Sequence, residues 1–291
     1  MRFLIVVLLI FLQYFGGAFA CEVTDDLGRT VSLPSPAKRI ISLAPDATEN
    51  LFAIGAGNHI VGVMQGSDYP SAAKKIPVVA RYNAIDTEMI LSLHPDLIVA
   101  WSEGGNIKQL EKKGIAVYVS HTKKLTDIPN TLQKLGCLVG NAKKANEVAN
   151  AYLQRYSALS KQYTQAKPVT VFYQLWPNPL ITITSQSWIN EAISFCGGRN
   201  IFAHLKTMAP EVTIESVIVK NPDMIVGADK KDDWKKSWQS WPTLRAAKHQ
   251  LLVNINPDLI ERASVRLLDG VSELCTSIDY ARKKLEHENI H

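Results

Sequence analysis

The chain lacks most of the short motifs that mark the commonest enzyme mechanisms. It has no GxSxG nucleophile elbow and no phosphate-binding P-loop. Residues 287–291 (HENIH) have the spacing of an HExxH zinc motif, but fraying and solvent at the extreme C-terminus are the better account of these two histidines. Gly55 and Gly57 begin like a dinucleotide-binding fingerprint, but the third glycine is missing and the pair follows a helical pattern. We interpret the pair as a helix stop. These absences favour a binding protein. The alternative from another functional class is an exported α/β enzyme with an active site between two lobes.

Clustered positive charge is also missing. The chain has 32 Lys and Arg against 27 Asp and Glu, a formal net charge of +5, and the basic residues are scattered along it. This pattern predicts a solvated surface and no nucleic-acid partner. No two cysteines form a CxxC pair, so a cysteine zinc cage is not expected, and we predict neither a metal site nor a cofactor.

No apolar run is long enough to cross a membrane as a helix. The longest, Phe3 to Leu12, would span about 15 Å, half of a hydrocarbon layer. It follows Arg2 and precedes Ala18-Phe19-Ala20, the layout of a secretory signal peptide cleaved after Ala20. Cys21 would then be the first residue. The leucine expected three positions before a lipidated cysteine is absent, so a soluble form is predicted and a lipoprotein is the alternative.

Export permits disulfides, and four cysteines allow three pairings if all are oxidised: Cys21, Cys137, Cys196 and Cys275. Cys137 lies in the apolar run 135–139, where a buried free cysteine is an equally good interpretation. The residues alone leave the pairing open.

One stretch occurs twice in the chain, 127 positions apart. Residues 88–100 and 215–227 each begin with a glutamate, continue as an apolar helical run, break at Pro-Asp and end in an apolar strand. A duplicated unit predicts two similar lobes, and two lobes predict a cleft that can enclose a ligand.

Strands alternate with helical patterns in both halves, which favours an α/β fold with parallel, helix-covered sheets. Between the halves, roughly 25 residues form one amphipathic helical pattern about 38 Å long, the span of a whole domain. We therefore predict a signal peptide (1–20), an N-terminal lobe (21–140) that starts with a hairpin, a connecting helix (141–167) and a C-terminal lobe (168–291). One rigid connection predicts a cleft that opens and closes only slightly.

Aromatic and polar side chains gather where predicted strands end, which is the edge at which open α/β sheets bind ligands. They come from both halves: Ser67, Asp68, Tyr69, Tyr82 and Trp101 from the first, and Leu175, Trp176, Glu261 and Arg262 from the second. Rings with a few polar groups suit a large, partly flat organic ligand. The alternative is that each ring fills the core of its own lobe.

Glu88 and Glu215 fall in the first turn of equivalent predicted helices. An acid there stabilises the helix by about 0.3–1 kcal/mol through the helix dipole, which is reason enough for its presence. Two equivalent acids on one rim would also form a two-point contact for a pseudo-symmetric basic partner. The residues alone do not decide between the two.

Six segments stand in a characteristic order and spacing: residues 40–49 (IISLAPDATE), 60–63 (IVGV), 67–70 (SDYP), 94–101 (HPDLIVAW), 196–202 (CGGRNIF) and 261–264 (ERAS). Together they resemble the periplasmic substrate-binding proteins of ABC importers for cobalamin, iron siderophores and haem. The likeness spans essentially the whole chain after residue 20, and the Asp-Tyr-Pro and Ala-Trp elements look most like the cobalamin branch.

The resemblance implies two Rossmann-like lobes joined by one long rigid helix, with a corrinoid between aromatic walls. It implies a periplasmic monomer that delivers cobalamin, as transported ligand, to a permease in the inner membrane and performs no chemistry on it. The residues it assigns to ligand binding are Ser67, Asp68, Tyr82, Trp101, Leu175, Trp176, Glu261 and Arg262. Glu88 and Glu215 match two glutamates that contact permease arginines, and Cys196 with Cys275 matches a disulfide of the C-terminal lobe.

Two departures concern the ligand. Gly66 and Ala209 stand where the cobalamin proteins present aromatic rings, and the hairpin in residues 21–36 is more familiar from siderophore binders. An iron siderophore or haem as cargo of the same transport mechanism is therefore the nearer alternative.

Overall fold

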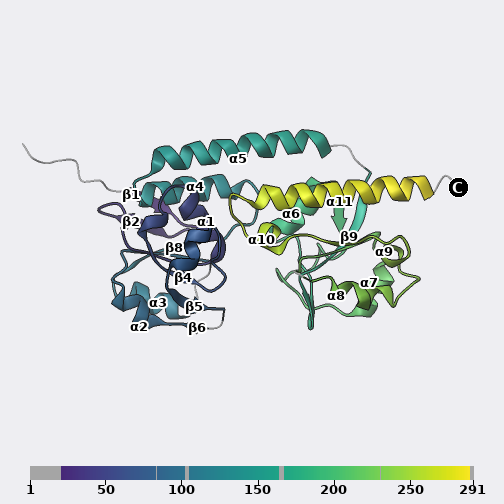
Figure 1. Ribbon diagram of the computed structural model, residues 1–291, viewed down its shortest axis with the longest axis horizontal. Coiled ribbons are helices and arrows are strands. Elements are labelled where there is room, and N and C mark those ends of the chain that lie inside the picture. Colours follow the sequence, from purple (N-terminus) through teal and green to yellow (C-terminus); the bar gives the residue numbers. More distant parts are fainter. Residues whose placement is uncertain (1–20, 83, 102–104, 164–166, 230, 289–291) are drawn as a thin grey trace, which may run out of the picture.

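Two α/β lobes lie side by side beneath two long helices in the computed structural model of the chain (Figure 1). The structure describes residues 21–82, 84–101, 105–163, 167–229 and 231–288, so the predicted signal peptide lies outside the described residues. The two long helices, α5 (Ala142–Tyr163) and α11 (Leu267–Glu288), pack against each other. No helix within the described ranges has the length and apolar character needed to span a membrane. The predicted α/β class is confirmed.

The N-terminal lobe is built on a six-stranded sheet with the order β6-β5-β4-β3-β7-β8. Its strands are β3 (Ile40–Leu43), β4 (Ile60–Met64), β5 (Val78–Arg81), β6 (Ala84–Ile85), β7 (Leu97–Ala100) and β8 (Ala116–Val119). All neighbours are parallel except β5 and β6. The central strands β3 and β7 are buried along their whole length, which explains their unbroken apolar sequences.

Helices cover this sheet and a hairpin precedes it. The helices are α1 (Pro45–Ala53), α2 (Thr87–Ser92), α3 (Gly105–Glu111) and α4 (Asp127–Leu138), with short 3-10 turns η2 (Gly57–His59) and η3 (Ser71–Lys75). The predicted hairpin is present as β1 (Cys21–Thr24) paired antiparallel with β2 (Thr30–Leu33). Gly28 in its turn has a φ of 80°, a conformation that glycine adopts without strain.

The C-terminal lobe repeats the plan with a four-stranded parallel sheet in the order β12-β9-β13-β14. Its strands are β9 (Val169–Gln174), β12 (Gly198–Asn200), β13 (Met224–Gly227) and β14 (Leu252–Asn254), and β10 (Trp176–Pro177) with β11 (Leu180–Ile181) forms a small hairpin. Its shorter helices are α6 (Trp188–Phe195), α7 (Ile214–Lys220), α8 (Asp233–Gln239), α9 (Arg245–Lys248) and α10 (Pro257–Ile260).

The two copies of the sequence repeat fold alike, as α2–β7 and α7–β13. The Asp86 side chain accepts a hydrogen bond from the Met89 amide (2.9 Å) and so caps α2, while Thr213 caps α7 in the same way. After each helix, the equivalent residues His94 and Asn221 adopt left-handed backbone angles, with φ of 45° and 42°. The repeat is therefore structural down to the conformation of single residues.

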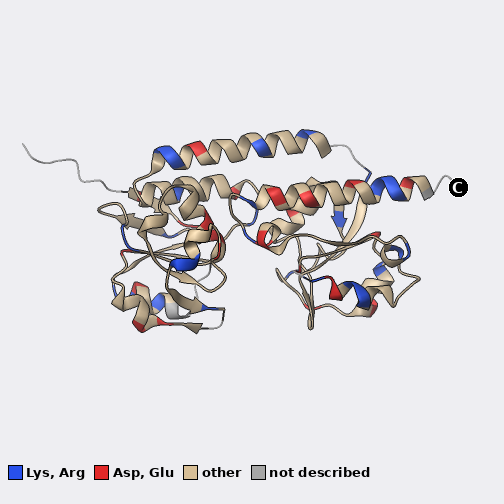
Figure 2. Ribbon diagram, viewed as in Figure 1, with Lys and Arg blue, Asp and Glu red and all other residues tan. Residues whose placement is uncertain are grey.

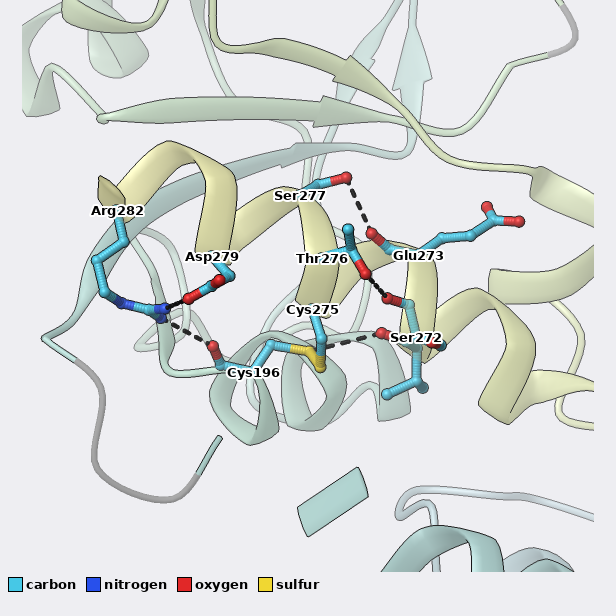
Figure 3. The surroundings of a disulfide bond; sticks show 9 residues. Cys196, Ser272, Glu273, Cys275, Thr276, Ser277, Asp279 and Arg282 are labelled. Carbon is cyan, nitrogen blue, oxygen red and sulfur yellow. Dashed lines mark hydrogen bonds and ion pairs between the residues drawn. A yellow bond between two sulfur atoms is a disulfide. The ribbon is translucent and has the colours of Figure 1, made fainter. Parts of the chain in front are cut away.

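Each lobe contains a disulfide bond. Cys21 in β1 bonds to Cys137 in α4, so the interpretation of Cys137 as a free cysteine is wrong. Cys196, at the end of α6, bonds to Cys275 in α11. Figure 3 shows this second bond beside Arg282, which donates to the Cys196 carbonyl (3.1 Å) and pairs with Asp279 (2.7 Å). The disulfide and this arginine together anchor α6 to α11.

Charge is spread over the ribbon, with Lys and Arg interspersed among Asp and Glu on both lobes and on both long helices (Figure 2). That distribution agrees with the solvated surface that the sequence predicts.

Candidate functional site

A cleft of about 830 Å³ lies between the two lobes. Four adjacent parallel strands of the N-terminal lobe contribute their last residues to its lining: Leu43 of β3, Met64 of β4, Arg81 of β5 and Ala100 of β7. The opposite wall comes from Leu175 just after β9, from the start of α6, from residues 208 and 209, and from Glu261. Ligands of open α/β sheets bind at this carboxyl edge, so topology alone places the cleft at a binding position.

Large rings face the cleft from both lobes. Tyr82 is fully exposed and Trp101 is 43% exposed, so neither ring fills the core of its lobe. Trp188 at the start of α6 lines the other side, and its indole nitrogen donates to the Ile260 carbonyl (3.0 Å), which fixes the orientation of the ring. Three rings on opposed walls can contact both faces of a flat ligand.

Four of the eight predicted ligand-binding residues belong to the lining: Tyr82, Trp101, Leu175 and Glu261. The other four do not. Ser67 is buried and accepts a hydrogen bond from the Thr48 hydroxyl (3.0 Å). Trp176 is 58% exposed on the β10–β11 hairpin and donates to the carbonyl of Asn178 (3.0 Å). Part of the predicted segment after Trp101, residues 102–104, lies outside the described residues.

Asp68 and Arg262 meet each other outside the lining, with 2.8 Å between Asp68 Oδ1 and Arg262 Nη1. Arg262 also pairs with Glu49 of the N-terminal lobe (2.9 Å) and with Asp258 (2.8 Å). The guanidinium therefore joins the two lobes in this structure, and its predicted contact with a ligand stays a prediction.

Glu49 on α1 is the centre of this junction, and sequence reasoning gave it no role. Its carboxylate is 1% exposed and accepts hydrogen bonds from Arg262 Nη1 (2.9 Å), Ser264 Oγ (2.5 Å) and Arg266 Nε (2.9 Å). The next residue, Asn50, donates to the Ala263 carbonyl (3.2 Å) and accepts from the Val265 amide (3.0 Å). We call Glu49, Asn50 and residues 262–266 the interlobe brace.

Two acids line the cleft and both titrate above their usual range. Burial raises the pKa of Glu261 to about 7, although a hydrogen bond from the Tyr173 hydroxyl (3.2 Å) opposes the rise. Burial likewise raises the pKa of Asp46, at the start of α1, to about 6, with a further contribution from the charge of Glu49. Near neutral pH Asp46 is therefore mostly ionised, whereas Glu261 is divided between its charged form and its neutral form, which can donate a hydrogen bond as well as accept one.

The two positions that lack an aromatic ring of the cobalamin pattern, Gly66 and Ala209, differ in their surroundings. Gly66 follows β4 with a φ of 90°, a conformation that an aromatic residue adopts only with strain. Ala209 lines the cleft beside Met208, so its small side chain leaves space in the wall.

Glu88 and Glu215 do not belong to the lining of the cleft. Both are exposed, in the first turns of α2 and α7. Figure 1 shows these helices on the sides of their lobes that face away from α5 and α11. Among the described residues, no group of three or more His, Cys, Asp or Glu is placed to hold a metal ion.

A family model described as periplasmic binding protein matches residues 40–257. The chain belongs to the periplasmic binding protein family. It is 38% identical over 269 residues to a vitamin B12-binding protein of Vibrio cholerae, which covers 91% of this chain and 98% of that protein. The resemblance carried by the six sequence segments is confirmed.

Solved structures of this family agree with the fold. The periplasmic vitamin B12-binding protein BtuF of Vibrio cholerae superposes with a TM-score of 0.79 at 37% identity, over 85% of this chain and 99% of that one. The haem-binding protein RhuT from Roseiflexus sp. RS-1 gives a TM-score of 0.76 at 19% identity, over 84% and 99%, and so shares the fold. These relatives are binding proteins.

Proposed function

We propose that this periplasmic binding protein captures cobalamin or a related corrinoid and delivers it to an ABC-type importer in the inner membrane. The observation that carries the proposal is the cleft of about 830 Å³ between the lobes, lined mostly by apolar side chains and by rings from both walls. A corrin is a large, flat macrocycle fringed with amides. Rings on opposed walls cover its faces, and the few polar groups at the cleft bond its fringe.

Binding without chemistry fits the same lining. No histidine or cysteine belongs to the described wall of the cleft. Tyr82 and Ser187 bring hydroxyl groups to that wall, and Ser187 caps α6 by accepting a hydrogen bond from the Ile189 amide (3.2 Å). Within the described residues the Ser187 hydroxyl donates no hydrogen bond to a carboxylate or an imidazole. A serine without such a base is a poorly activated nucleophile, which supports a carrier that releases its ligand unchanged.

The proposal includes export of the protein and the organisation of its chain into two lobes. Residues 1–20 act as a signal peptide cleaved after Ala20, followed by lobes at 21–140 and 168–291 joined by the helix at 141–167. The sulfur of Cys21 is bonded to Cys137, whereas a lipid anchor would need that sulfur for its thioether. This pairing supports a soluble periplasmic form over a lipoprotein, and we propose that this form is a monomer. Loss of Arg2 with the signal peptide would lower the net charge from +5 to +4.

Delivery uses Glu88 and Glu215 in this proposal. They hold equivalent positions in the two copies of the repeat, are exposed, and lie on helices that face away from α5 and α11. Two separated carboxylates suit a permease with two pseudo-symmetric basic sites, because charge-assisted pairs between Arg and carboxylate fix orientation as well as distance.

Titration calorimetry of the purified protein with cyanocobalamin, haem and a ferric catecholate tests the choice of ligand. We expect heat that saturates at one cyanocobalamin per protein, and none with the ferric catecholate. Haem is the sharper comparison because Tyr82, exposed at the cleft, could coordinate haem iron. Absence of heat with cyanocobalamin and with other corrinoids would contradict the proposal.

A further inference from the structure

Arg81 is the one basic side chain in the described lining of the cleft. It is the last residue of β5, is exposed, and is followed by the fully exposed ring of Tyr82. Its Nη1 donates to Gln65 Oε1 at 3.3 Å, a long bond to a neutral partner. Within the part of the chain that the structure describes, no carboxylate forms an ion pair with it. The guanidinium is therefore available to an anion on a ligand.

The acids of the cleft lie away from Arg81. Asp46 follows β3, and β4 separates β3 from β5 in the sheet. Two strand spacings correspond to about 10 Å between the carboxyl ends of β3 and β5. Glu261 enters from the opposite lobe. The cleft thus holds its positive charge toward the β5–β6 edge and its acids toward the centre of the sheet and the facing wall.

A ligand that matches this pattern carries a cationic centre and an anion some distance apart. Complete corrinoids have both, because the cobalt–corrin core is cationic and the nucleotide loop contains one phosphodiester. Cobinamide has the same macrocycle without that phosphate. Arg presents its N–H groups in a fork that matches two phosphate oxygens, which is why it suits such a contact better than Lys.

We propose that Arg81 pairs with the phosphodiester of the nucleotide loop and makes the cleft selective for complete corrinoids over incomplete ones. The inference rests on the proposed function of the same cleft. Because the side chain lies at an exposed edge, the contact is screened by salt and weakens as ionic strength rises.

The test is calorimetry with cyanocobalamin and dicyanocobinamide on the wild-type protein, Arg81→Gln and Arg81→Lys. We expect Arg81→Gln to weaken cyanocobalamin binding by about tenfold in low salt, the range of one charge-assisted contact at a partly exposed site. Its affinity for dicyanocobinamide should change less than twofold, and Arg81→Lys should lose less than Arg81→Gln. The loss for cyanocobalamin should shrink in high salt.

Each ligand serves as its own reference, so the different axial groups of the two corrinoids do not enter the comparison. Arg199→Gln is the matched control, since Arg199 is exposed in β12 and does not line the cleft. Equal weakening of both ligands by Arg81→Gln, or no change with either, would overturn the inference while leaving the proposed function intact. Failure of the wild-type protein to bind either corrinoid would instead contradict the proposed function.

Discussion

At the scale of single residues, Trp101 is the ring on which ligand binding should depend most. Its side chain is 43% exposed at the end of β7, where a ligand can cover it. Trp101→Ala should weaken corrinoid binding by about 1–3 kcal/mol, the range for an aromatic anchor that becomes buried on binding. Trp241→Ala is the control, because Trp241 is similarly exposed (40%) outside the cleft. Equal affinities of wild type and Trp101→Ala in calorimetry would show that this ring does not contact the ligand.

Glu261 should give the free protein a pH-dependent stability. Its pKa rises from the usual 4.5 to about 7 in the folded state, so the folded protein holds this proton more tightly than the unfolded chain does. The associated stability is complete below about pH 4.5 and is lost as pH rises through 7. Glu261→Gln stays neutral and does not lose this stability. The free energy of unfolding of Glu261→Gln should therefore rise relative to that of wild type by up to about 3 kcal/mol as pH increases from 5 to 8.

Urea denaturation of wild type and Glu261→Gln at both pH values measures this difference. Glu273→Gln is the control, since Glu273 is exposed on α11 and does not line the cleft. Parallel stabilities of wild type and Glu261→Gln across the range would mean that Glu261 is solvated in the folded protein.

Site residues could be predicted from the sequence where they follow strands. They could not be predicted where only contacts in the folded protein reveal them. Tyr82, Trp101 and Leu175 were predicted because they follow strands, and ligands bind at that edge. Glu49 was missed because its partner Arg262 is 213 positions away, and a glutamate in a helical segment gives no sign of burial. Arg81 was missed for the opposite reason, since an exposed arginine at the end of a strand is unremarkable until a cleft forms beside it.

At the scale of elements, the interlobe brace connects α1 of one lobe to the segment that enters α11 in the other. Glu49→Gln removes the buried charge that Arg262 and Arg266 share, leaving both guanidinium groups without this partner. Breaking a buried ion pair from one side costs about 3–5 kcal/mol, so Glu49→Gln should lower the free energy of unfolding by that order.

The control for the brace is Glu147→Gln, which removes an exposed pair with Lys144 on α5 and should cost less than about 0.5 kcal/mol. Chemical denaturation of both variants gives the comparison. Similar, small losses in the two variants would show that the brace contributes no more than a surface ion pair.

Element order was largely predictable, whereas contacts between distant elements were not. The repeat and the long connecting pattern could be read because helix and strand periodicities are local. The packing of α11 along α5, and the ion pair of Arg155 with Asp269 between them (2.6 Å), join segments more than a hundred positions apart. The pairing of Cys21 with Cys137 was left open for the same reason, since sequence gives no distance between them.

These contacts bear on how far the cleft moves. The lobes are connected by α5, by the helix pair α5–α11, by the interlobe brace and by the Leu125 amide, which donates to the Glu191 carboxylate. Slight opening and closing stays a prediction, and these contacts favour it together with the rigid helix on which it was based.

At the scale of the whole molecule, ligand capture and delivery should be separable. Reversing both Glu88 and Glu215 to Lys should abolish cobalamin uptake by cells while calorimetric affinity for cyanocobalamin stays unchanged, because both residues lie outside the cleft. The matched control reverses Glu147 and Glu286, which are exposed on α5 and α11. Loss of affinity in step with uptake would mean that these two acids shape the cleft instead of contacting a permease.

The position of cobalt in a crystal of the protein grown with cyanocobalamin tests the central claim most directly. Anomalous scattering at the cobalt edge locates the metal without any assumption about the rest of the ligand. We expect one cobalt peak between the lobes, with the corrin covering Tyr82 and Trp101 on one side and facing Trp188 on the other. A cobalt peak outside this cleft, or crystals without cobalt at saturating ligand, would contradict it.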